Sequence, residues 1–133
     1  MIHRATVEDL DHILTLTQEF NDEYYHRPLN LDKTLTMIRH MVEHGVVFVS
    51  AKGYIGGMVV PDNFRDDDVL VEFGWFAKDK SGISLLDVFI QAGKDLGVNE
   101  IRMCTMSTSP EVANRILERR GFKSTETSHR LEL

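Results

Sequence analysis

Cysteine, proline and tryptophan are scarce in this chain: one Cys, three Pro and one Trp occur among 133 residues. The single cysteine, Cys104, cannot form an internal disulfide, which suits a reducing compartment. No apolar run approaches the roughly 18 residues that a membrane-spanning helix needs. Residues 1–4 lead straight into patterned sequence and lack the apolar core of a signal peptide, so we expect a cytoplasmic protein with no membrane contact.

A basic stripe is also missing. The formal net charge is −6, and the acidic residues are dispersed along the chain. Nucleic-acid binding relies on clustered Lys and Arg that contact the phosphate backbone. We therefore do not expect nucleic acid as a partner. The chain has no linker, repeat or low-complexity tract, and its 42% apolar content suffices for one core. We therefore expect a single domain over residues 1–133.

Hydrophobic periodicity and capping signals predict the order of elements. Thr6 and Asp9 form a capping box at the start of the first helix, Asn30 precedes a second, and Gly45 ends it. The remaining segments with strand or helix patterns are listed in chain order: strands 2–5, 46–51, 54–60 and 69–77, helix 82–96, strand 101–106, a helix from Ser109-Pro110 to Gly121, and one or two closing strands within 122–133.

The order β-α-α-β-β-β-α-β-α-β predicts an α/β fold. A helix between the fourth and fifth strands implies a right-handed parallel crossover within a mixed sheet. We expect three layers, with four helices around a sheet of six or seven strands.

Four segments in this order resemble landmarks of the GCN5-related N-acetyltransferase (GNAT) superfamily. They are the opening strand and cap at 2–10, the hairpin 46–60 with Gly56-Gly57, the core motif 72–76 with its following helix, and the Gly-Phe ending of 113–122. Together they span most of the chain. The segment from Trp75 to Arg102 looks closest to small GNAT-like proteins of tailed phages.

The resemblance implies acetyl transfer from acetyl-CoA to an amine. It assigns Phe76 and Ala77 to the strand that holds the pantetheine arm. It assigns the pyrophosphate to the loop and helix start formed by Lys78, Lys80, Ser81, Gly82, Ile83 and Ser84, with Asn114 on the last helix as a further contact. The loop departs from the family pattern, because acid or Lys stands where Arg or Gln is usual and only one glycine is present. The closing strands of such folds often pair between subunits, so a homodimer is compatible.

Glu72 is the candidate general base. It is the only acid in the most apolar strand, and burial raises the pKa of a carboxyl toward neutrality. Its position also matches that of a catalytic Glu in many GNAT enzymes. The alternative is a structural Glu that faces the sheet edge or forms a salt bridge.

The tyrosine that the resemblance implies as general acid is absent. Many GNAT enzymes carry a Tyr five residues before the Phe of the Gly-Phe ending, and Leu117 stands there. Tyr24, Tyr25 and His26 lie in the connection that borders the acceptor pocket in this fold. They are candidate substrate residues, or else a cluster that packs or lies at the surface.

Two further features are given a structural interpretation. His40-Met41-Val42-Glu43-His44 matches the H-x-x-E-H zinc motif, but a third ligand is not evident and we expect no metal. Cys104 is expected to be a small buried apolar residue on a strand.

A second function from another class remains open: a non-catalytic GNAT-fold module that binds a partner protein, in a phage virion or a host cell. The altered phosphate loop and Leu117 favour this alternative.

Overall fold

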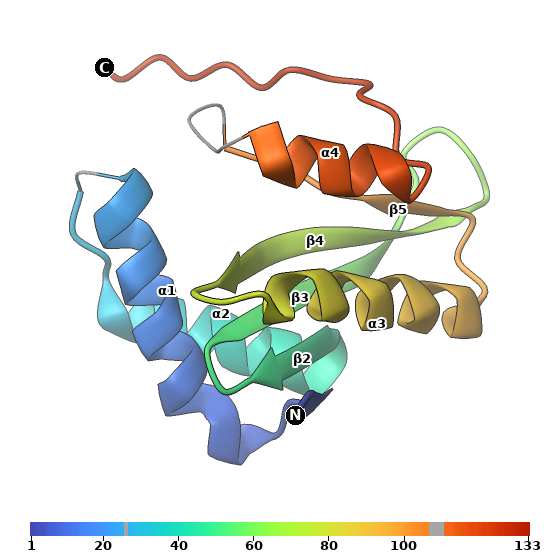
Figure 1. Cartoon of the computed structure of the whole chain (residues 1–133). Coiled ribbons are helices and arrows are strands. Elements are labelled where there is room, and N and C mark those ends of the chain that lie inside the picture. Colours follow the sequence, from blue (N-terminus) through green and yellow to red (C-terminus); the bar gives the residue numbers. More distant parts are fainter. Residues whose placement is uncertain (26, 107–110) are drawn as a thin grey trace.

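The computed structural model describes residues 1–25, 27–106 and 111–133. Over these residues the chain forms, in order, β1 (His3–Arg4), the 3-10 helix η1 (Val7–Asp9), α1 (Leu10–Tyr24), α2 (Leu31–His44), β2 (Val46–Ser50), β3 (Gly53–Pro61), β4 (Asp68–Ala77), α3 (Ser81–Leu96), β5 (Glu100–Arg102) and α4 (Glu111–Arg119) (Figure 1). The predicted α/β class and the four helices are confirmed. In the same ranges, no helix is both long and apolar enough to cross a membrane.

The five strands form one mixed sheet with the spatial order β1-β2-β3-β4-β5. Neighbouring strands are antiparallel except for β4 and β5, which pair in parallel. Helix α3 makes the connection between these two strands, as the sequence order predicts.

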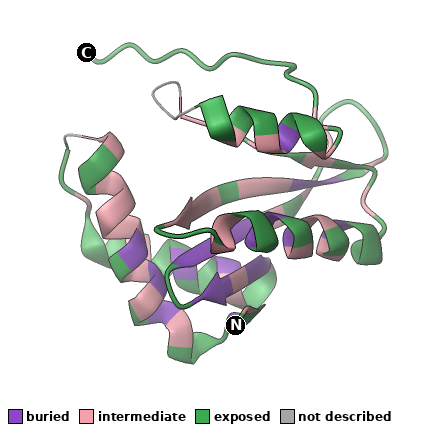
Figure 2. Ribbon diagram, in the orientation of Figure 1, coloured by how far each residue is buried: buried purple, intermediate pink, exposed green. Residues whose placement is uncertain are grey.

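Helices cover both faces of the sheet, so two hydrophobic clusters form. One cluster lies between the sheet and helices α1 and α2, and it contains Ile13, Leu16 and Val47. The other lies beneath α3 and α4, and it contains Val46 and Phe89. Adjacent residues Val46 and Val47 point into opposite clusters because side chains alternate along a strand. Figure 2 shows the buried positions gathered on the central strands and on the helix turns that face them.

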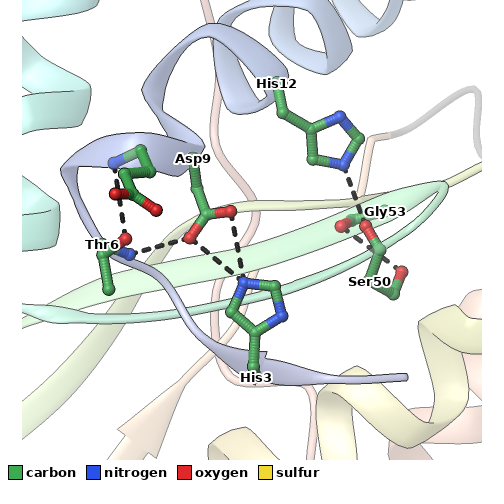
Figure 3. Close-up of polar contacts among 7 residues, drawn as sticks. His3, Thr6, Asp9, His12, Ser50 and Gly53 are labelled. Carbon is green, nitrogen blue, oxygen red and sulfur yellow. Dashed lines mark hydrogen bonds and ion pairs between the residues drawn. The ribbon is translucent and has the colours of Figure 1, made fainter.

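The predicted capping box is present but opens a 3-10 turn before α1 begins. The Thr6 N–H donates to Asp9 Oδ2 at 2.8 Å, and the Glu8 N–H donates to Thr6 Oγ1 at 3.3 Å. His3 Nε2 lies 3.2 Å from both carboxylate oxygens of Asp9, and His12 Nε2 lies 2.9 Å from the carbonyl oxygen of Ser50 (Figure 3). The His12 contact holds the start of α1 against the end of β2, and the His3 contact joins β1 to η1.

The closing strands expected within 122–133 are wrong, because this stretch has no strand. The sheet has five strands among the described residues, and the expectation of six or seven is not confirmed. Beyond Phe122 the segment is polar except for Leu131 and Leu133, which are exposed, so it has no apolar face that pairing would bury. The strand expected at 101–106 is also shorter and ends at Arg102. The predicted cap at Ser109-Pro110 lies outside the described residues.

Candidate functional site

The main cleft of the molecule lies between the end of α1, the second half of β4, the start of α3, the chain after β5, and α4. Its volume is about 910 Å3. Residues 72–80 run through it as one continuous wall, and residues 104–106 line the opposite side. The cleft therefore forms where β4 and the chain after β5 are no longer paired.

The parting of β4 from β5 follows from the pairing register. The two strands pair only over residues 69–71 of β4 and 100–102 of β5. Beyond that point β4 pairs with β3 alone in the described sheet, which leaves its other edge facing the cleft. A bulge marks the transition: Gly57 is opposite Glu72, whereas Gly56 is opposite Gly74, so Phe73 is the extra residue.

Glu72 is the acid at this transition. Its side chain lines the cleft, and the backbone N–H of Cys104 donates to its Oε1 at 3.1 Å. Burial raises the pKa of Glu72 to about 7, although the bond from Cys104 acts in the opposite direction. Among the described residues Glu72 has no ion-pair partner, so the salt-bridge alternative is not observed there. A carboxyl with this pKa exchanges protons readily near neutral pH.

Tyr54 is a cleft residue that sequence reasoning missed. It is buried on β3, and a Cβ at Gly74 would lie 2.7 Å from its hydroxyl oxygen. Gly74 thus leaves the space that the Tyr54 ring occupies. The sequence feature that could have indicated this packing is a tyrosine in a predicted strand whose neighbouring strand contains a glycine.

The Tyr54 hydroxyl lies 3.2 Å from Thr17 Oγ1, which also donates to the carbonyl oxygen of Ile13 at 2.8 Å. Thr17 has one hydroxyl proton, so when it bonds to Ile13 it accepts from Tyr54. Burial raises the pKa of Tyr54 above its usual value, and the charge of Glu72 raises it further. Tyr54 therefore remains protonated at physiological pH.

The residues assigned to the cofactor are brought together only in part. Phe76, Ala77, Lys78, Lys80, Gly82 and Ile83 all line the cleft. Ser81 and Ser84 lie outside its lining, and so does Asn114, whose Oδ1 accepts a hydrogen bond from Thr105 Oγ1 at 2.8 Å.

The start of α3 already has a carboxylate partner. Asp79 Oδ1 accepts from the backbone N–H of Ser81 at 3.0 Å and also from the Ser81 hydroxyl. Those two bonds lower the pKa of Asp79, so the carboxyl is ionised at neutral pH. Lys78 Nζ is likewise 2.9 Å from Glu19 Oε2. Two of the residues predicted to bind phosphate, Lys78 and Ser81, are thus already bound to acidic side chains of the same protein.

The candidate substrate residues Tyr24 and Tyr25 line the cleft, whereas His26 lies outside the described residues. Phe20 packs between them and Phe76, with ring centroids 4.8 Å from Tyr24, 6.1 Å from Tyr25 and 5.5 Å from Phe76. We call these four residues the aromatic cluster.

The structure also places Cys104 and the histidine pair of α2, for which separate expectations follow from the sequence. Cys104 is exposed and lies beyond β5, so its expected burial on a strand is wrong. The rings of His40 and His44 are 4.9 Å apart on α2, but no group of three or more His, Cys, Asp or Glu among the described residues could hold a metal ion. Leu117 is buried in the second hydrophobic cluster.

No family model matches this sequence, and no curated protein sequence matches it. Solved structures do match over the whole chain. An acetyltransferase from Trypanosoma brucei superposes with a TM-score of 0.71 at 17% identity, covering 100% of this chain and 99% of that one. A protein from Pyrococcus furiosus, provisionally named an acetyl transferase, gives 0.77 at 15% identity with the same coverage.

This chain therefore has the same fold as these structures. A transcriptional regulator from Bacillus halodurans also matches, with a TM-score of 0.77 at 17% identity, 100% of this chain and 99% of that chain being covered. Since one fold can carry different activities, the residues of the cleft determine the function and the fold alone does not.

Proposed function

We propose that this protein is an acetyl-CoA-dependent N-acetyltransferase of the GNAT superfamily. The observation that carries the proposal is Glu72, whose pKa of about 7 suits a general base, at the open edge of β4 in the cleft. Among the described residues Glu72 has no ion-pair partner, and a carboxyl with a raised pKa in a cleft is a candidate functional group.

Acetyl-CoA, the acetyl donor, would lie in the cleft along β4. The backbone of Phe76 and Ala77 on the open strand edge suits the amides of an extended pantetheine arm, as a neighbouring strand would. Lys80 and the start of α3 would face the phosphates, where the helix dipole favours negative charge. Asp79 opposes this end of the site, so the affinity for acetyl-CoA depends on whether phosphate displaces its bonds to Ser81.

The reaction removes two protons from the acceptor ammonium and delivers one proton to the leaving thiolate. Glu72 takes the proton from the acceptor ammonium, directly or through water, and the neutral amine nitrogen attacks the acetyl carbonyl carbon. The C–S bond of the thioester then breaks, and the nitrogen loses its second proton to water as the neutral amide forms. The thiolate takes its proton from water, because Leu117 offers none.

Acetyl-CoA binding by calorimetry is the first test, with Lys80→Gln as the variant and Lys94→Gln, near the far end of α3, as the matched control. We expect micromolar binding that only Lys80→Gln weakens. Glu72→Gln should bind acetyl-CoA normally and lose transfer to an amine. Absence of binding at millimolar acetyl-CoA would overturn the proposal.

One observation favours the second candidate, a non-catalytic protein-binding module. Asp79 bonds the first N–H of α3, the group that would otherwise meet phosphate. If neither the wild type nor Asp79→Asn binds acetyl-CoA, this candidate replaces the first. The phage-like origin, the cytoplasmic location and the homodimer stay predictions.

A further inference from the structure

The two ends of the cleft differ in chemistry. Lys80 lines the cleft near the start of α3 and Lys78 pairs with Glu19 of α1, whereas Glu23 and the aromatic residues of α1 line its other part and Glu72 lies on β4. Glu19, one helix turn before Glu23, is neutralised by Lys78. Glu23 is exposed and has no ion-pair partner among the described residues. The acceptor end therefore combines aromatic faces with negative charge, a combination that favours cations.

A cationic side chain of the protein itself already contacts the aromatic cluster. The guanidinium carbon of Arg130 lies 5.8 Å from the centroid of the Tyr25 ring, within the range of a cation–π contact. Arg130 belongs to the segment after α4, which crosses the molecule without strand structure (Figure 1). The Tyr25 ring thus already holds a cation, and a cationic ligand would have to displace Arg130 from it.

The Tyr25 ring is held in place from the other side of the cleft. Its hydroxyl donates to Met106 Sδ at 3.5 Å, and its ring packs against Phe20 with centroids 6.1 Å apart. These contacts join the end of α1 to the chain after β5. A ring fixed in this way loses little conformational entropy when a ligand binds.

We propose that the acceptor is a small diamine, with one amine at Glu72 and a second, permanently protonated amine on the Tyr25 face beside Glu23. The inference rests on the proposed function, since it assigns the reacting amine to Glu72. The reacting nitrogen must lose its proton, so it contributes little charge–charge binding in the reactive state. The second amine keeps its charge throughout and supplies the binding that selects the substrate.

The experiment compares straight-chain diamines of three to six carbons with monoamines of the same lengths. Binding is followed by calorimetry and by the fluorescence of Trp75, which is the only tryptophan and lines the cleft. We expect the best diamine to bind about tenfold more tightly than its matched monoamine, since a desolvated cation–π contact and a carboxylate both add to affinity.

Three variants locate the second amine. Tyr25→Leu should weaken diamine binding about fivefold while Tyr25→Phe, which keeps the aromatic face, should not; Glu23→Gln should weaken it by a few fold. Tyr25→Leu and Glu23→Gln should each weaken diamine binding more than monoamine binding. Arg130→Gln should strengthen diamine binding, because it removes the competing cation.

The failures of the two proposals are separable. Equal binding of diamines and monoamines, loss of all amine binding, or no effect of Tyr25→Leu would overturn the diamine inference even if acetyl-CoA binds well. Diamine selectivity that depends on Tyr25, without any acetyl-CoA binding, would instead overturn the acetyltransferase and leave a cation-binding site.

Discussion

The backbone N–H of Cys104 donates a hydrogen bond to Glu72 Oε1 at 3.1 Å, across the cleft that separates β4 from the chain after β5. The bond favours the ionised carboxylate, and burial disfavours it. Burial is the larger effect, because the pKa of Glu72 rises to about 7. The acid is thus anchored and oriented while it remains able to take a proton near neutral pH.

Transfer activity should follow the ionisation of Glu72. With a pKa of about 7, the fraction of ionised base falls tenfold for each pH unit below that value. We expect kcat/KM of the wild type to rise between pH 5 and 7 and to level off above. Steady-state rates measured at saturating acetyl-CoA across this range check it. Glu72→Gln should lose about 100-fold or more in rate, within the usual range for a general base. A Gln variant with the wild-type rate and profile would assign the base elsewhere.

Glu72 should also make stability depend on pH. Its folded-state pKa of about 7 lies above the ordinary 4.5, so between these values the folded state binds more protons than the unfolded state. The free energy of unfolding therefore falls as pH rises through this window, by at most about 3 kcal/mol. Urea titrations at pH 5 and 8 should show this loss in the wild type and a smaller loss in Glu72→Gln. Equal losses would mean that Glu72 is not desolvated in the folded protein.

The parts of the site that could be predicted from sequence are those that depend on local pattern. Glu72 stands out as an acid in an apolar strand, and the position of residues 76–80 follows from a strand that runs into a helix. Tyr54 could not be found in this way, because its place depends on the missing side chain of Gly74 on the next strand. The hydrogen bond from the Ser81 N–H to Asp79 is local, but the resemblance implies phosphate as the partner of this loop and not a side chain of the loop itself.

The errors in the fold have a similar origin. The strand pattern assigned to residues 122–133 predicted one or two closing strands, yet this stretch has no strand. The composition of the segment argued against these strands, since only Leu131 and Leu133 follow Phe122 as apolar residues. Cys104 was assigned to a strand because apolar residues surround it, yet β5 ends at Arg102 and leaves it at the cleft.

The packing of Tyr54 against Gly74 predicts a coupled pair. An added Cβ at Gly74 would lie 2.7 Å from the Tyr54 hydroxyl and 2.8 Å from a ring carbon, so Gly74→Ala should destabilise the fold by roughly 1–3 kcal/mol. In a Tyr54→Leu background the same substitution should cost less, because the obstructing ring is gone. Thermal or urea unfolding of the four proteins gives the coupling free energy. Additive effects would contradict the contact.

The charge of Asp79 should limit the affinity for acetyl-CoA. Asp79→Asn keeps an acceptor for the Ser81 N–H, so the turn before α3 keeps this hydrogen bond, while the negative charge next to the phosphates is removed. We expect acetyl-CoA to bind about threefold to tenfold more tightly, with the gain shrinking as salt is added, because the interaction is exposed and screened. Asp95→Asn, near the other end of α3, removes the same charge far from the phosphates and is the matched control. Calorimetry at two ionic strengths measures both variants. Unchanged affinity in Asp79→Asn would mean that phosphate does not approach α3, and the bound cofactor would then have to lie elsewhere along β4.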